Sequence, residues 1–107
     1  MGKPFYADYA EHALRYYSRF CTPTTMPRDC SAVDRANIDA CQAALAGIPV
    51  NERALIVNLH RMRDRMPNNV RAVSGQTGIP EDDIWLLVKR VNRDVALHRG
   101  LVSPIQR

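Results

Sequence analysis

Apolar side chains recur every three or four residues along almost the whole chain, and this spacing limits the possible folds more than any other feature. A period of about 3.6 residues places side chains on one face of an α-helix, whereas a half-buried strand needs strict alternation. We find no convincing alternation and no internal repeat. The chain has 107 residues, 46% of them apolar, so a single core without metal or disulfide is feasible. The pattern predicts an all-α protein with a single domain over residues 1–107.

Proline, glycine and capping residues divide the pattern into about five helices. We expect these helices over residues 5–20, 31–46, 52–66, 70–77 and 81–98. Ser31, Asn51 and Asn69 are the expected N-caps of the second, third and fourth helices, because their short polar side chains accept hydrogen bonds from orphan amides. Gly78 is expected to take a positive φ in a tight turn before the fifth helix. Gly100 is expected to end the fifth helix in the same conformation.

The charge of the chain is mildly positive. The formal net charge is +4, and arginine supplies every basic residue except Lys3 and Lys89. Because the guanidinium fork suits phosphate and carboxylate, this composition favours an anionic partner. A solvated basic surface would have the same composition, so this alternative stays open.

Cysteine usage and hydropathy bear on the compartment. Cys21, Cys30 and Cys41 include no C-x-x-C pair, so we expect thiols in a reducing cytosol rather than a zinc site. No long apolar stretch indicates a secretory signal or a membrane span. We therefore expect a cytoplasmic protein without a membrane partner.

Features of an enzyme are missing from the sequence. His12, His60 and His98 fall on three different expected helices, without the H-E-x-x-H spacing of a zinc protease. There is no nucleophile elbow and no phosphate-binding loop. We expect no catalytic residues, no metal, no cofactor and no small-molecule substrate.

The most informative segment runs from about residue 45 to residue 93. It reads L-x-x-I-P-x-x-E-R-x-L-I and, further on, V-S-x-x-T-G-I-P-x-x-x-I. Val73 and Ile84 flank Gly78 at distances that let two helices joined by a short turn bury both side chains against each other. The segment resembles region 4 of sigma-70-type sigma factors, and the chain is similar to small sigma-like helix-turn-helix regulators of phages and mobile elements of Gram-positive bacteria. The matching residues are Leu45, Pro49, Glu52, Arg53, Leu55, Ile56, Val73, Ser74, Gly78, Ile79 and Ile84.

The resemblance implies a tetrahelical helix-turn-helix over residues 47–100, with an N-terminal helical part (1–46) packed on it and a tail (101–107). It implies a transcriptional regulator that binds double-stranded DNA through its fifth helix, with RNA polymerase or a second copy of the chain as further partners. A full sigma factor is not expected, because we find no sigma region 2 and 107 residues leave no room for one beside this segment. The residues it assigns to DNA are Arg71, Ser74, Gln76, Thr77, Asp82, Trp85, Lys89, Arg90 and Arg93.

The start of the fifth helix departs from the family. It begins with Pro80 followed by Glu81, Asp82 and Asp83, and carboxylates repel phosphates, although one can accept from a cytosine amino group. As an alternative to a contact with DNA, Trp85 would pack against the first helix or against a second copy of the chain. A helical protein-interaction module that has the same fold and does not bind DNA therefore stays open as an alternative.

Overall fold

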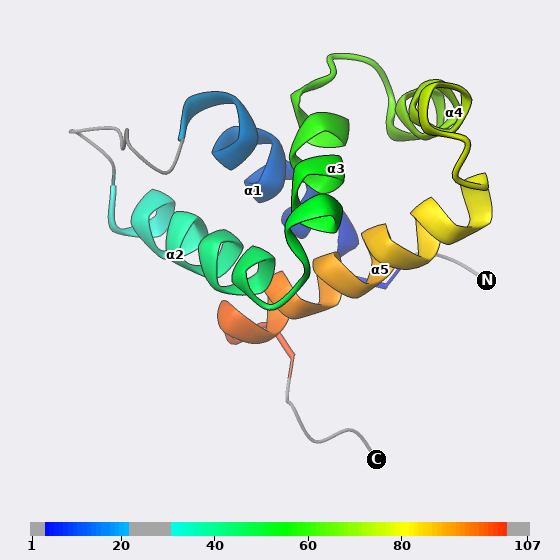
Figure 1. Ribbon diagram of the computed structural model, residues 1–107. Helices are drawn as coiled ribbons and strands as arrows, with labels where there is room; N and C mark the ends of the chain where they lie inside the picture. Colours follow the sequence, from blue (N-terminus) through cyan, green and yellow to red (C-terminus); the bar gives the residue numbers. More distant parts are fainter. Residues whose placement is uncertain (1–3, 22–30, 103–107) are drawn as a thin grey trace.

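The computed structural model describes residues 4–21 and 31–102, and within these residues it contains five α-helices and no strand (Figure 1). The expectation of an all-α chain of about five helices is confirmed. The helices are α1 (Ala7–Phe20), α2 (Ala32–Ala46), α3 (Val50–Arg61), α4 (Met66–Thr77) and α5 (Glu81–His98).

The longest helix, α5, organises the packing. It contacts each of the other four helices, and α1 also packs against α2 and α3. In Figure 1, α5 extends from the neighbourhood of α4 at one end to that of α2 at the other. The N-terminal helices α1 and α2 therefore pack on the C-terminal half of the chain.

All five helices contribute to one hydrophobic cluster. Each supplies at least one fully buried side chain, because each has an apolar stripe at helical spacing. Examples, one from each helix in order, are Leu14, Cys41, Ile56, Val70 and Ile84. Since the cluster spans the whole set of helices, no part of the described chain has a separate core.

Three helix ends follow the local signals in the sequence. The Ser31 hydroxyl accepts a hydrogen bond of 3.1 Å from the Asp34 amide and so caps α2. Gly78 has a φ of 78° and ends α4, and Gly100 has a φ of 77° after α5. Because L-residues with a Cβ rarely adopt this conformation, glycine suits both positions.

The expected limits of the third and fourth helices are wrong. α3 ends at Arg61, and α4 already begins at Met66, because Pro67 is tolerated in the first turn of a helix. Asn51 lies inside α3, whose N-cap is Pro49. Asn69 is buried within α4 and is not its cap.

Candidate nucleic-acid interface

The helix α5 carries different side chains on its different faces. Its core stripe includes Ile84 and Val88, both buried. At about 100° per residue, positions four apart share a flank. Trp85 and Lys89 therefore lie on one flank of α5, and Asp83 lies on the opposite one.

A groove runs along the first of these flanks and has a volume of about 620 Å³. Its positive lining comes from Lys89, Arg90 and Arg93 of α5, all exposed, and these residues with Trp85 define what we call the basic groove. The opposite wall comes from the start of α1 and the first turn of α4. Glu11 of α1 also lines the groove, and its carboxylate accepts a 3.3 Å bond from Arg15, so its charge is paired.

Trp85 packs on the core and also borders the basic groove. It is half-buried and packs against the hydrophobic cluster. It also lines the basic groove, together with Tyr6, the N-cap residue of α1, and Pro67 of α4. A ligand in the groove would therefore meet a fixed indole ring beside three cations.

The structure brings together only part of the residue set assigned to DNA. Trp85, Lys89, Arg90 and Arg93 line the basic groove, and Asp82 is exposed in the first turn of the same helix. Arg71 and Gln76 are exposed on α4 and do not line this groove; Ser74 and Thr77 also lie on α4.

The hydroxyls of Ser74 and Thr77 are engaged within the turn between α4 and α5. Ser74 Oγ donates to the Ile79 carbonyl at 2.6 Å. Thr77 Oγ1 donates to the Val73 carbonyl at 2.8 Å and accepts from the Ile79 amide at 3.2 Å. These bonds hold the turn, so the two side chains position α5 relative to α4.

The acids at the start of α5 occupy its first turn, and all three are exposed. No side chain caps the helix, so carboxylates near its positive end stabilise it through the helix dipole. Asp83 lines a second groove on the other side of α5. The three carboxylates therefore do not form one acidic surface facing the basic groove.

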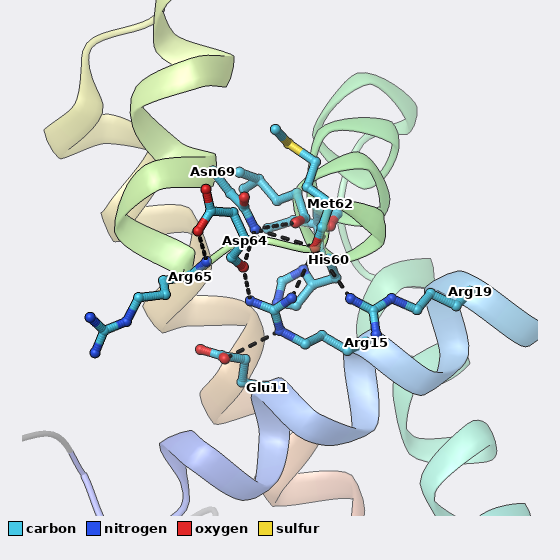
Figure 2. Close-up of polar contacts among 10 residues, drawn as sticks. Glu11, Arg15, Arg19, His60, Met62, Asp64, Arg65 and Asn69 are labelled. Carbon is cyan, nitrogen blue, oxygen red and sulfur yellow. Dashed lines mark hydrogen bonds and ion pairs between the residues drawn. The ribbon is translucent and has the colours of Figure 1, made fainter.

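The connection between α3 and α4 is held by hydrogen bonds from side chains to backbone carbonyls that sequence reasoning missed (Figure 2). Arg15 of α1 donates to the carbonyls of Met62 and Asp64, both at 2.9 Å. The side-chain amide of Asn69 donates through Nδ2 to the carbonyls of Leu59 at 3.2 Å, Met62 at 3.4 Å and Asp64 at 3.1 Å. No sequence pattern predicts these bonds, because their acceptors are backbone carbonyls, which every residue has.

This clamped connection carries further positive charge. Arg61, Arg63 and Arg65 are exposed around it. Two hydrogen bonds to the Asp64 carboxyl lower its pKa. The larger effect comes from the backbone amide of Arg65 and the smaller from the Asn68 side chain. Since the loop backbone is fixed from α1 and α4, the three arginines extend from a defined frame beside the start of α4.

His60 is buried in α3, and burial lowers its pKa to about 4. Its Nδ1 lies 2.7 Å from the Ile56 carbonyl, so the neutral ring donates its proton there. At neutral pH this histidine is a core residue without charge.

Cys21 and Cys41 are buried, and Cys30 lies outside the described residues. Burial raises the pKa of the Cys41 thiol to about 12. Within residues 4–21 and 31–102, no group of three or more His, Cys, Asp or Glu side chains could hold a metal ion. None of the helices in the described part of the chain is long and apolar enough to cross a membrane.

Comparison of the chain with known protein families, with curated protein sequences and with solved structures finds no match.

Proposed function

We propose that this protein is a DNA-binding transcriptional regulator in which α4, the turn at residues 78–80 and α5 act as a helix-turn-helix. One observation carries the proposal: Lys89, Arg90 and Arg93 are exposed together on α5 and line one groove. In this mode of binding, the second helix of the unit enters the major groove and flanking cations contact phosphates.

The fixed geometry of the turn supports the proposal. A recognition helix reads bases only if its supporting helix holds it at a constant angle. The bond between Ser74 and Ile79 and the left-handed Gly78 join the two helices through a connection of three residues. Val73 of α4 and Ile84 of α5 are both buried on either side of it.

The acidic start of α5 is compatible with DNA because its carboxylates point in different directions. Asp82 has nearly the same angular position as Lys89 and Arg93, since seven and eleven residues are close to whole numbers of helical turns. A carboxylate on this face accepts a hydrogen bond from the cytosine amino group. Asp83 lines the groove on the other flank of α5, which Lys89 and Arg93 do not line. We expect Asp82 to contribute to base selection and the cations to affinity.

The test is fluorescence anisotropy with a labelled duplex of mixed sequence at low salt, comparing the wild-type chain with Lys89→Ala/Arg90→Ala. Two lost phosphate contacts are expected to weaken binding by more than about tenfold. The matched control is Arg35→Ala, an exposed arginine in the first turns of α2, which lies across the molecule from α4 in Figure 1.

Equal affinities of the wild type and the double variant would refute this placement of the DNA-binding surface. Equal losses of binding free energy per charge removed, in the double variant and in Arg35→Ala, would indicate attraction by net charge alone. Absence of any binding at low salt would refute the DNA-binding function and favour the protein-interaction module.

A further inference from the structure

A second groove lies on the other side of α5, between α3, the end of α4 and the first turns of α5, again with a volume of about 620 Å³. Its floor is apolar and includes Leu55, Ile79 and Leu87, all half-buried. Two carboxylates line it, Glu52 from α3 and Asp83 from α5. We call it the acidic groove, defined by these five residues.

Glu52 has a buried oxygen without a partner. It occupies the third position of α3, where a glutamate ordinarily bonds to the amide of the N-cap residue. The N-cap here is Pro49, which has no amide hydrogen. Glu52 Oε1 is buried, and no described residue forms a hydrogen bond with it. A buried carboxylate oxygen in this state gains much from a cationic donor.

The neighbouring arginine does not serve as that donor. Arg53 Nε donates to the Leu45 carbonyl at 2.9 Å, and one of its terminal nitrogens donates to the Ile48 carbonyl at 3.2 Å. These bonds tie the end of α2 to α3. The charge of the Glu52 carboxylate therefore stays available to the groove.

The two grooves lie on opposite sides of α5, and side chains of opposite charge line them. Lys89, Arg90 and Arg93 line one groove, while Asp83 and Glu52 line the other. A polyanion is attracted to the first and repelled from the second. The acidic groove thus has a different kind of partner from the proposed DNA surface.

We propose that the acidic groove binds an amphipathic helix of a partner protein, one that carries an arginine or lysine among its apolar anchor residues. The apolar floor accepts anchors spaced at three or four residues, as in other helix-in-groove complexes. The cation pairs with Glu52 and Asp83, which supplies the missing donor for Glu52 Oε1. This inference does not depend on DNA binding, because it uses other residues.

The test is a display selection with a library of helical amphipathic peptides, in which the polar and charged positions are randomised, against the full wild-type chain. Enriched peptides are expected to carry a basic residue within an apolar helical stripe. Their dissociation constants are then measured on Glu52→Gln and on Asp83→Asn, which keep the side-chain shape and remove the charge. Loss of one charge-assisted bond is expected to weaken binding about tenfold. The matched control is Glu81→Gln, an exposed acid of the same helical turn that does not line the groove.

Three results would overturn the inference: no enriched peptide, enriched peptides without a basic residue, or equal weakening in Glu81→Gln. Circular dichroism of each variant verifies that the helices are retained, so loss of binding is assigned to the charge. The same variants are titrated with duplex DNA, where Glu52→Gln is expected to leave the affinity unchanged or slightly higher. Failure of peptide binding with intact DNA binding would refute only this inference, and the reverse would refute only the DNA-binding proposal.

Discussion

The Ser74 hydroxyl donates a hydrogen bond of 2.6 Å to the Ile79 carbonyl, and this bond joins the last turn of α4 to the residue that follows Gly78. Ser74 is half-buried, so the bond is partly shielded from water. It fixes the direction in which the chain enters α5. The bond thus contributes to the orientation of α5 relative to α4, alongside the packing of α5 against the other helices.

Replacement of Ser74 by alanine tests the role of this bond. Loss of a hydrogen bond to a partly buried carbonyl is expected to lower the free energy of unfolding by about 1 kcal/mol and the melting temperature by about 5 °C. The control is Gln76→Ala, because Gln76 is exposed on the same helix. Thermal unfolding measures both variants. A Ser74→Ala protein as stable as the wild type would contradict the structural role.

Replacement of Arg15 by methionine tests the clamp between α1 and the α3–α4 connection. Methionine keeps an apolar stem but loses the donors to the Met62 and Asp64 carbonyls. We expect a loss of about 2 kcal/mol in unfolding free energy, since both bonds come from a charged donor. Urea unfolding measures this loss, with Arg71→Met, at an exposed position of α4, as the control. Similar midpoints for the two variants would show that the clamp contributes nothing.

Burial of neutral His60 predicts a dependence of stability on pH. The pKa in the folded chain is about 4, below the ordinary 6.5, because burial disfavours the charged ring. The unfolded chain therefore binds the proton first as the pH falls, so stability is complete above about pH 6.5 and decreases toward about pH 4. At about pH 5 the loss is expected to reach about 2 kcal/mol.

Urea unfolding of the wild type and of His60→Leu measures this effect between about pH 7 and about pH 5. The variant is expected to lose most of the dependence, whereas His12→Gln, at an exposed histidine of α1, is expected to keep it. An identical dependence in the wild type and in His60→Leu would show that another group is responsible.

Local features of the fold could be predicted from the sequence, and features that depend on distant backbone atoms could not. Ser31 and Gly78 act within their own turns, so a short stretch of sequence is sufficient to assign them. Asn69 has the same capping chemistry, but here its amide binds carbonyls of the preceding helix and loop. Arg15 finds its acceptors 47 and 49 residues away.

The candidate site shows the same division. Lys89 and Arg93 lie on the exposed face of α5, outside its apolar stripe, and helical spacing alone is sufficient to predict this position. Asp83 and Glu52 line a separate groove because α3 packs against α5. This arrangement cannot be predicted from the spacing of residues within one helix. The resemblance to sigma region 4 stays a prediction.

The most direct test of the central claim is the affinity of the wild-type chain for mixed-sequence duplex DNA across a series of salt concentrations. If Lys89, Arg90 and Arg93 each neutralise one phosphate, the logarithm of the association constant should fall with the logarithm of the salt concentration with a slope of about −3. In Lys89→Ala/Arg90→Ala the slope should decrease in magnitude by about 2. Absence of binding at low salt, or a slope that the double variant leaves unchanged, would contradict the assignment of α5 as the DNA-binding helix.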